Sequence, residues 1–442
     1  MLRIGQRKLL LAGLILILAF CALNYRAYDG YFQDDELDTL SWAPGLGLRE
    51  YAPAFAKPTF DLFNFRPTGH LYFTLAGKAF GLDFPPYVTP VFAAHLLNGL
   101  LLFLLLRRLK IAAFTALGGT AFFVLSGAAM DAYWKPMYVF DLFCTTFCLA
   151  SLLLWSRGRW ILSFLAYWLA YKAKELAVML PLVLLAWEFW LAEQKRYLRL
   201  VPFFVTSLSF GVQGILLNPN KDNEYTFRFT LDALRQTIPF YARRFLMFRG
   251  SGLLLLPLLL VRDKRVWFGL TGLLAFTFTL LFLPGRRFEA YTYLPMACVA
   301  IALTSAATKV RPMWAAAALA LWLPWNALQV RKEQREVLRK DDAAFAFVDQ
   351  LENWVRRHPG VRTMVYEGMP GEYHNWGVTA AWNIVHRASG MQAFFLDTPE
   401  ARKALESEPV AYVQWNSVAR KPAISIHSPL LPGTPGQTPT PK

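Results

Sequence analysis

The chain has 442 residues, of which 55% are hydrophobic and 16% aromatic. Together with a positive mean hydropathy, these values exclude an ordinary soluble globular protein and indicate a polytopic membrane protein. The net charge of +16 does not indicate a nucleic-acid partner, because the Lys and Arg residues form short clusters between apolar runs rather than one basic stripe.

The first predicted element is an apolar span over residues 9–24, which follows the basic residues Arg3, Arg7 and Lys8. The sequence around its end, Cys-Ala-Leu-Asn-Tyr-Arg, lacks a clear small-x-small cleavage site. We therefore expect this span to remain as an uncleaved anchor.

Further spans follow wherever a stretch approaches the roughly 20 apolar residues that a crossing needs. Their basic flanks fall at alternate turns, on the same side as the N-terminus, which is the positive-inside pattern. The chain is thus predicted to be an integral protein of a bacterial inner membrane, with about eleven crossings, a cytoplasmic N-terminus, and residues 25–86, 218–240 and everything after 331 on the outer face. The later spans lie near residues 87–106, 111–130, 137–155, 159–171, 176–192, 198–217, 245–261, 266–283, 290–308 and 312–330.

The first external loop, residues 25–86, is too long and too polar for a simple connector. An acidic cluster, Asp-Asp-Glu at 34–36 followed by Asp38, lies near its start. Residues 71–82 predict a helix on the membrane surface, since this run is too short to cross and carries Lys78 at its middle. A crossing there would invert every later turn and break the charge pattern.

Ionisable and aromatic residues stand together at each of the outer junctions. Charges at membrane depth are costly, and they are usually functional where they face the interior of a helix bundle. We therefore take these junctions as the candidate site. Its residues are Arg66 and His70 in the first loop, Asp131, Lys135 and Asp141 at the next junction, Lys172, Lys174 and Glu175 at the third, and Arg286, Arg287, Tyr291 and Tyr293 at the last.

After residue 331 the charge density rises and the apolar runs shorten. Predicted strands then alternate with helices, which is typical of a small α/β domain over residues 331–428. The final residues, 429–442, are rich in Pro, Thr and Gly and predict a disordered tail. The expected helices cover 332–357, 376–388 and 399–407, and the expected strands cover 363–367, 393–397, 410–415 and 423–427.

Five motifs occur in order along residues 1–330. They are a short first span, an acidic pair early in a long outer loop, Arg66-Pro67 before an amphipathic helix, Lys174-Glu175 before a proline-containing span, and a late Arg pair followed by Tyr-Thr-Tyr-Leu-Pro. This order resembles glycosyltransferase superfamily C (GT-C), and within it the protein O-mannosyltransferase and lipid A aminoarabinose transferase group and the membrane part of the transmembrane-TPR mannosyltransferases. The chain departs from these proteins in having three successive acidic residues and no TPR array.

The resemblance implies an all-α transmembrane domain over residues 1–330, with juxtamembrane helices in the first outer loop. It also implies an inverting transfer of a hexosyl or pentosyl group from a polyprenyl-phosphate donor to a hydroxyl of a protein or glycan acceptor. A carboxylate within hydrogen-bond reach can take the acceptor proton. Asp35, paired with Glu36 as the family's Asp-Glu, is the first candidate, and Asp34 is the second. Because adjacent carboxylates raise each other's pKa, one of them could instead orient the acceptor or bind Mg²⁺ or Mn²⁺.

The departing lipid phosphate needs cations, and Arg suits it through a planar fork of donors. The candidates for the donor phosphate are Arg66, Lys174, Arg286 and Arg287, with the hydroxyls of Tyr291 and Tyr293; His70, Asp131, Asp141 and Glu175 are candidates to orient the acceptor.

Simpler roles stay open for several of these residues. The arginines at 286–287 could reach lipid headgroups from a helix end. Lys174 could pair with Glu175, Asp131 could cap a helix, and His70 could bond within its loop.

No chemistry is assigned to two of the junction lysines or to the polar residues within the spans. Lys172 and Lys135 are expected to be solvated, whereas His95, inside a span, is expected to bond a neighbouring helix. The four cysteines have neither the spacing of a zinc site nor that of a disulfide framework, so they predict small buried side chains. They are Cys21, Cys144, Cys148 and Cys298.

Three rival functions fit the same composition. A polysaccharide polymerase or O-antigen ligase has a similar number of spans, but such enzymes usually carry their main functional loop late in the chain. A lipid-linked sugar flippase or transporter would need charges inside the spans, whereas here the charges gather at the outer junctions. An inactive relative that only binds lipid would not need an intact carboxylate.

Overall fold

The computed structural model describes residues 4–60, 65–217, 222–371 and 373–429, so most of the expected tail lies outside the described residues. The chain divides into two compact units. A helical unit comprises Met1–Tyr28, Leu46–Ala76 and Pro85–Gln334, and a mixed unit comprises Asp29–Gly45, Gly77–Phe84 and Arg335–Lys442. The acidic cluster at 34–38 therefore belongs to the same unit as the C-terminal residues.

The helical unit is a set of packed helices. They are α1 (Ile4–Asn24), α3 (Leu48–Ala56), most of α4 (Pro67–Phe80), α5 (Pro85–Arg108), α6 (Ala113–Leu125), α7 (Met130–Trp134), α8 (Val139–Ser156), α9 (Trp160–Ala173), α10 (Leu180–Trp190), α11 (Val201–Leu217), α12 (Leu231–Arg244), α13 (Lys264–Leu281), α14 (Tyr293–Ala307) and the first half of α15 (Pro312–Arg357). Helix α8 packs along α5 and α9, and α13 packs along α14.

Small residues allow the closest of these contacts. A Cβ at Gly269 of α13 would lie 2.7 Å from the main-chain nitrogen of Ala302 on α14, so only glycine fits there. Such close approach is typical of helices that pack within a membrane, where no hydrophobic force draws one helix to another.

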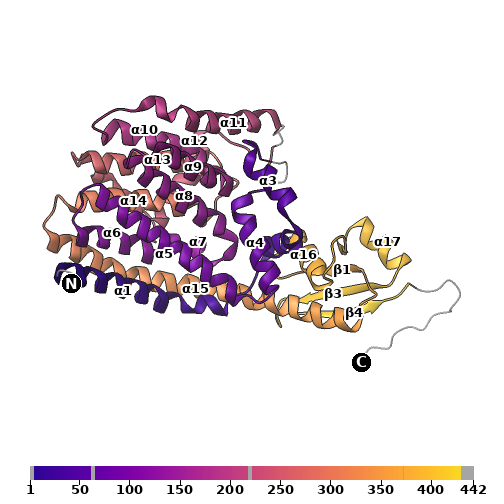
Figure 1. Ribbon diagram of the computed structural model, residues 1–442. Helices are drawn as coiled ribbons and strands as arrows, with labels where there is room; N and C mark the ends of the chain where they lie inside the picture. Colours follow the sequence, from indigo (N-terminus) through magenta and orange to yellow (C-terminus); the bar gives the residue numbers. More distant parts are fainter. Residues whose placement is uncertain (1–3, 61–64, 218–221, 372, 430–442) are drawn as a thin grey trace. The chain divides into compact units, whose positions relative to one another are not determined.

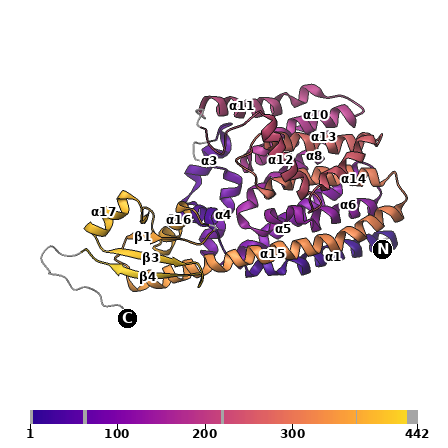
Figure 2. The same cartoon turned by 180° about the vertical axis from the view of Figure 1, so that it is seen from behind.

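Helices α1 and α15 lie side by side along the helical unit in both ribbon views (Figure 1 and Figure 2). The guanidinium of Arg331 donates to the carbonyl of Ala22 at 3.2 Å, and the amide of Gln334 donates to the side chain of Asn24 at 2.9 Å. The opposite face of α1 exposes a row of leucines and isoleucines. Soluble proteins rarely expose an apolar face of this size, so the face indicates contact with lipid.

Four helices of the described residues are long and apolar enough to cross a membrane, and a fifth span results if a pair bent by 52° is counted as one. These findings support an integral membrane protein, whereas the predicted count of about eleven crossings is not confirmed. The four are Gly5–Asp29, Pro85–Arg108, Pro136–Ser156 and Glu289–Ala307, and the bent pair is Ala113–Leu125 with Gly127–Trp134.

Two predicted spans differ from the structure in form. The expected span over 245–261 is a 10-residue 3-10 helix, Ser251–Leu260, that follows Gly250 in the left-handed region and contains Pro257. Glycine and proline both disfavour a regular α-helix at this place. The expected span over 312–330 and the expected helix over 332–357 form one continuous helix, α15, because Pro324 does not interrupt it.

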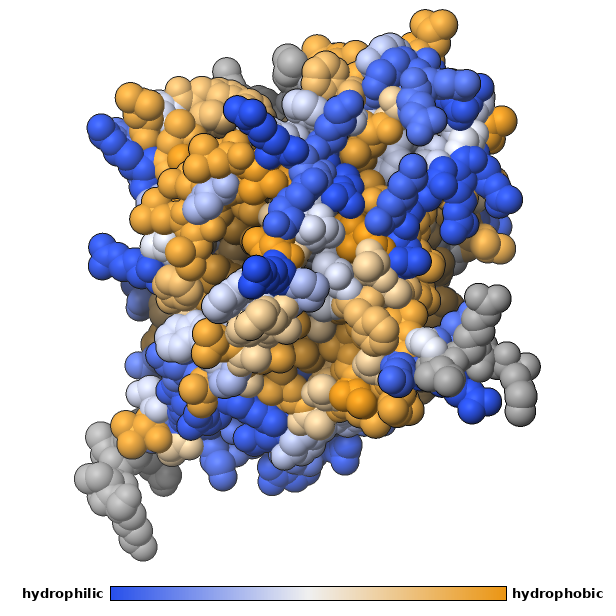
Figure 3. All heavy atoms as spheres, turned by 90° about the vertical axis from the view of Figure 1, so that its left-hand side faces the viewer, coloured by the Kyte–Doolittle hydropathy of each residue, from blue (hydrophilic) through white to orange (hydrophobic). Residues whose placement is uncertain are grey.

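One end of the helical unit, where α1 begins, mixes hydrophilic and apolar side chains (Figure 3). Hydrophilic side chains form several groups, above the middle, toward the upper right and along the lower edge of this view, and apolar side chains lie between them. The basic clusters at 107–110 and 157–159 lie where α5 gives way to α6 and α8 to α9. The orientation of the chain in the membrane, with a cytoplasmic N-terminus, stays a prediction.

The mixed unit contains a four-stranded sheet of order β2-β1-β3-β4. The strands are β1 (Thr363–Glu367), β2 (Gln392–Phe395), β3 (Val410–Asn416) and β4 (Lys421–His427), and the helices are α2 (Asp34–Trp42), α16 (Asn375–Val385), α17 (Pro399–Ser407) and the last part of α15. Strand β1 pairs in parallel with β2 and β3, and β3 pairs antiparallel with β4. The alternation of strands and helices that the sequence predicts is thereby confirmed.

The core of the mixed unit explains why these short elements fold. Val365 of β1 and Val410 of β3 are buried with Ala401 and Ala404 of α17. Helix α17 is bounded by a good cap, because the hydroxyl of Thr398 accepts from the main-chain N–H of Ala401 at 3.3 Å. Apolar residues spaced two apart on the strands and three to four apart on the helix thus pack into one small core.

A buried polar network joins the central helices of the helical unit. In it His95 bonds a neighbouring helix, as expected. Its Nε2 lies 3.0 Å from the carbonyl oxygen of Val124, and its Nδ1 lies 2.7 Å from the hydroxyl of Tyr293. Because a carbonyl only accepts, Nε2 carries the proton and Nδ1 accepts from Tyr293. Asn98 donates to the same hydroxyl at 3.1 Å. Tyr293 is thus a fully buried packing residue of this network.

Two expectations about exposure are wrong. Lys172 is fully buried rather than solvated: its ammonium donates to the carbonyl of Thr59 at 3.1 Å and lies 4.8 to 5.4 Å from the ring centroids of Phe60, Trp168 and Tyr171. Cation–π contacts offset part of the free-energy cost of removing such a charge from water. Cys21 is exposed, whereas the other three cysteines are buried as expected.

A charged cluster centred on Arg244 joins α12 to α15. Its guanidinium lies 2.7 Å from a carboxylate oxygen of Glu289 and 2.7 Å from one of Glu333. Asp131, in the first turn of α7, also interacts with Arg244 electrostatically. Asp131 thus belongs to this structural cluster.

The cluster makes a stability prediction. Arg244→Met leaves the two part-buried carboxylates of Glu289 and Glu333 facing each other without their shared cation, so it should destabilise the protein by about 3 kcal/mol. Thermal unfolding of detergent-purified protein measures the loss. Arg235→Gln on the same helix removes an exposed pair with Asp232 and should change stability by less than about 0.5 kcal/mol. Equal unfolding midpoints for the two variants would contradict the role of the cluster.

Candidate functional site

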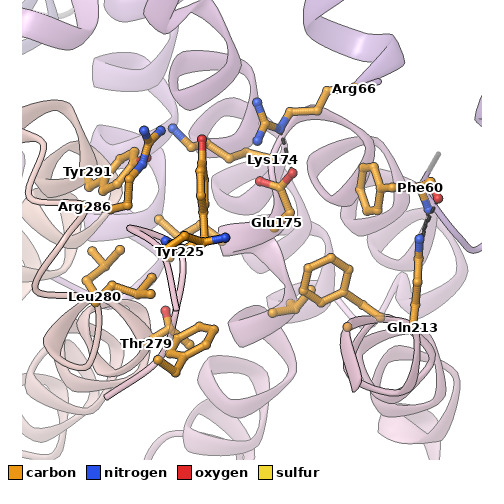
Figure 4. Close-up of a pocket in the computed structure, with 17 residues that line it drawn as sticks. Phe60, Arg66, Lys174, Glu175, Gln213, Tyr225, Thr279, Leu280, Arg286 and Tyr291 are labelled. Atoms are coloured by element: carbon orange, nitrogen blue, oxygen red, sulfur yellow. Dashed lines mark hydrogen bonds and ion pairs between the residues drawn. The ribbon is translucent and has the colours of Figure 1, made fainter. Parts of the chain in front are cut away.

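A cavity of about 500 Å³ lies within the helical unit, and it collects several of the predicted residues. Figure 4 shows the charged groups of Arg66, Lys174 and Arg286 gathered on one side of this pocket, with Leu280 and Phe60 on its other walls. The lining residues are Phe60, Arg66, Lys174, Glu175, Leu176, Val178, Phe210, Gln213, Gly214, Asn223, Tyr225, Phe227, Thr279, Leu280, Leu283, Arg286 and Tyr291.

Arg66 enters the pocket from the N-terminal end of α4. Pro67 begins that helix, a position that suits proline because the first helical N–H has no partner in the helix. The Arg66 Nε lies 2.7 Å from a carboxylate oxygen of Glu175. Burial acts against both charges, but the pairing outweighs it, so the pKa of Arg66 lies above its ordinary value and that of Glu175 below. Both groups are therefore ionised over the physiological range.

His70 supports this end of α4. It is buried in the helix, and its Nδ1 accepts from the main-chain N–H of Arg66 at 2.9 Å. Burial, and then the charge of Arg66, lower the pKa of His70 to about 3. The imidazole thus stays neutral and holds the main chain that carries Arg66, so His70 does bond within the first outer loop, residues 25–86, as its simpler role allowed.

Lys174 and Glu175 do not pair with each other. Helix α9 ends at Ala173, and Lys174 is extended, with φ of −160° and ψ of 144°, before a 3-10 turn begins at Glu175. This break sends the two side chains to different partners. Lys174 forms an ion pair with the buried Asp141 of α8, and its ammonium lies 4.4 Å from the ring centroid of Tyr291.

Arg286 forms the third cationic wall of the pocket. Its guanidinium lies 4.3 Å from the ring centroid of Tyr225 and 4.5 Å from that of Phe288. Glu224 is 3.6 Å away, but its side chain is 70% exposed, so water screens this pair. Arg287, by contrast, is exposed, lies 6.0 Å from the ring of Phe240 and does not line the pocket. Tyr293 is also absent from the lining, because it is buried in the network with His95.

The charges of the pocket leave room for one anion. Arg66, Lys174 and Arg286 bring three positive charges to the lining and Glu175 brings one negative charge, while Asp141, outside the lining, adds a second negative charge through its ion pair with Lys174. The remaining positive charge suits a singly charged anion. The apolar walls opposite the cations suit an apolar group attached to that anion.

The acidic cluster opens helix α2 in the mixed unit. Glu36 has a structural role, since its carboxylate accepts from the main-chain N–H of Gln33 at 2.6 Å, as a capping box does. Asp34 is buried, Asp35 is exposed, and Asp38 is half-buried. Negative charges are favourable in the first turn because they face the positive end of the helix dipole.

Sequence reasoning missed two residues that bind these carboxylates. The main-chain N–H of His374 donates to Asp34 Oδ1 at 3.0 Å, and Nδ1 of the same residue lies 2.5 Å from Asp34 Oδ2. The indole N–H of Trp376 donates to Asp35 Oδ1 at 3.2 Å. A signal existed, because His374 and Trp376 follow the carboxyl end of the parallel strand β1, where α/β sheets commonly place their sites.

Within the described residues, no group of three or more His, Cys, Asp or Glu side chains is arranged to hold a metal ion. The possible Mg²⁺ or Mn²⁺ site at the carboxylates therefore gains no support. The predicted residues thus separate: Arg66, Lys174, Glu175, Arg286 and Tyr291 line the pocket of the helical unit, whereas Asp34, Asp35 and Glu36 lie in the mixed unit.

Comparisons of sequence find no relative, since no family model matches the chain and no curated protein does. Comparisons of structure do. The crystal structure of ArnT from Cupriavidus metallidurans in the apo state matches with a TM-score of 0.52 at 12% identity, over 91% of this chain and 93% of ArnT. The cryo-EM structure of the arabinofuranosyltransferase AftD from Mycobacteria matches with a TM-score of 0.52 at 13% identity, over 88% of this chain but only 32% of AftD. The chain thus shares its fold with ArnT and AftD, two glycosyltransferases of the superfamily that the order of its sequence motifs resembles.

Proposed function

We propose that the protein is an integral-membrane glycosyltransferase that moves a sugar from a polyprenyl-phosphate donor to a hydroxyl acceptor, with inversion at the anomeric carbon. The observation that carries this proposal is the pocket, in which three cations face apolar walls within a GT-C fold. A flippase or a polymerase gains no such support from the described residues.

The cations of the pocket are assigned to the donor phosphate. Arg66 and Arg286 can each present two N–H groups to its oxygens, and Lys174 adds a point charge. Tyr291 adds a hydroxyl beside them. Glu175 and Asp141 position Arg66 and Lys174 rather than the acceptor, because each is already the partner of one cation.

A carboxylate of the acidic cluster is assigned to the acceptor. As the acceptor oxygen attacks the anomeric carbon, the bond from that carbon to the phosphate oxygen breaks, and the hydroxyl proton passes to the carboxylate. Asp35 suits this role because it is exposed and accepts one hydrogen bond from protein. Asp34, buried with a hydrogen bond to each oxygen, remains the second candidate.

The C-terminal domain is proposed to cover or select the acceptor, because its loop after β1 contacts the carboxylates. A photoreactive acceptor analogue should label residues of the mixed unit when bound to the full chain. Labels confined to the helical unit would refute this role.

Transfer itself is tested with the purified chain in lipid vesicles and radiolabelled polyprenyl-phosphate sugars. Loss of label from the lipid together with labelling of a protein or glycan acceptor supports the proposal. Movement of the labelled lipid between leaflets without transfer would favour a flippase instead. Binding without either would favour an inactive lipid-binding relative.

Donor binding makes a separate prediction at Arg286. Arg286→Gln removes a charged hydrogen bond that is worth about 1.5–3 kcal/mol, so the KM for the donor should rise about 10- to 100-fold. The matched control is Arg228→Gln, whose side chain is 50% exposed and pairs with Asp222, and it should leave the KM unchanged. A donor KM that is the same in both variants would remove Arg286 from the phosphate site.

A further inference from the structure

A loop of the C-terminal domain is built onto the acidic cluster. Residues 374–377 follow β1 and open helix α16, and they reach both oxygens of Asp34. The two residues of the pair are separated by 340 positions in the chain, so this contact exists only because the mixed unit folds around α2.

Gly377 makes the contact possible. A Cβ at this position would lie 1.8 Å from Asp34 Oδ1 and 3.1 Å from the Asp34 Cα, so any larger residue would displace the carboxylate or its main chain. The imidazole of His374 is also fixed from its other side, since it stacks on the indole of Trp376 at 4.1 Å with an angle of 7° between the rings. That indole donates to Asp35.

Hydrogen bonding determines which nitrogen of His374 carries the proton. An ionised carboxylate only accepts, so Nδ1 must donate to Asp34, and in the neutral imidazole Nε2 then has the free electron pair. The side chain of His374 is 61% exposed, whereas that of Asp34 is 11% exposed. The imidazole thus lies between the buried carboxylate of Asp34 and the solvent.

We propose that His374 is a positioning residue of the transfer reaction, which holds Asp34 ionised and oriented beside the proton-accepting Asp35. This inference rests on the proposed function. It makes the C-terminal domain a part of the base site, in addition to any contact that the domain makes with the acceptor.

A pH dependence separates this role from a purely structural one. Asp34 faces Asp35 and Asp38 on its own helix and His374 and Tyr373 on the loop, while Asp341 of α15 interacts with the neighbouring Tyr373. Burial and then Asp35 raise the pKa of Asp34, and the hydrogen bonds and charge of His374 oppose that rise. Without the imidazole the pKa should rise further, so activity should be lost at a higher pH as the medium is acidified.

The experiment measures kcat and KM for the donor against pH in the full-length chain. His374→Ala should lower kcat about 10- to 100-fold, leave the donor KM unchanged, and move the acidic limb of the kcat profile upward by about one pH unit. His374→Gln should recover part of kcat, because a Gln amide can donate a hydrogen bond to Asp34 in place of the imidazole. Gly377→Ala should lower kcat similarly, because its methyl group displaces the carboxylate.

Two control variants and a measurement of thermal stability complete the experiment. His427→Gln, exposed on β4, and Gly371→Ala, whose Cβ would meet nothing within 4 Å, should match the wild type. An unchanged kcat and acidic limb in His374→Ala would overturn the inference, and so would a loss that tracks thermal stability without a pH shift. Absence of any transfer by the wild-type chain would instead refute the proposed function, which the positioning role requires.

Discussion

Asp35→Asn should abolish sugar transfer while leaving donor binding intact. Removal of a general base typically costs about 10² to 10⁴ in rate, and Asn keeps the size and the hydrogen bond from Trp376. Single-turnover transfer from a radiolabelled donor measures the effect. The measurement should be made together with a binding assay for the same lipid, because unchanged binding shows that the pocket of the helical unit is still formed.

The variant Asp34→Asn tests which of the two carboxylates is the general base. We expect a smaller loss than for Asp35→Asn, because Asp34 acts through its neighbour and because an amide can still accept one of its two hydrogen bonds. A larger loss for Asp34→Asn would assign the base role to Asp34. Undiminished transfer in both variants would exclude the acidic cluster from the chemistry, and Asp397→Asn in an exposed turn serves as the matched control.

Lys174→Met should cost both stability and transfer, for two separable reasons. The Lys174 side chain is 13% exposed and its partner Asp141 is 5% exposed. Breaking one half of such a pair leaves an unpaired buried charge, with a cost of about 3–5 kcal/mol. The same substitution removes a cation from the phosphate pocket, so kcat/KM for the donor should fall about 100-fold.

The double variant Lys174→Met with Asp141→Asn separates these effects. It removes the orphaned carboxylate, so most of the lost stability should return, as measured by thermal unfolding in detergent. Transfer should not return, because the phosphate still lacks its cation. Recovery of transfer along with stability would mean that Lys174 only holds the helices together.

The sequence predicted the parts of the site better than their partners. It placed Lys174 and Glu175 together at one junction, and both do line the pocket. It allowed them to pair with each other, because neighbours in sequence are the only partners that a pattern can suggest. In the structure Lys174 pairs with Asp141 of α8 and Glu175 pairs with Arg66, which lies just before α4, since the chain breaks from helix to 3-10 turn between them.

The same limit applies to other residues. Tyr293 and Arg287 belong to the motif that resembles GT-C, but only Arg286 and Tyr291 of that motif line the pocket. Lys172 looks like a solvated charge in sequence, because Phe60 and the carbonyl of Thr59, which bury it together with aromatic rings of its own helix, are more than a hundred residues away in the chain.

The sequence by itself determined the membrane class, the order of the junction motifs that resembles GT-C, and the strands and helices of the C-terminal domain. These features depend on local composition and on spacings of two to four residues, and both can be recognised without knowledge of the fold. Only the tertiary structure decided which charges meet, as in Arg66 with Glu175 and Asp34 with His374. Partners separated by more than a hundred residues are brought together by packing, and no periodicity in the sequence encodes that choice.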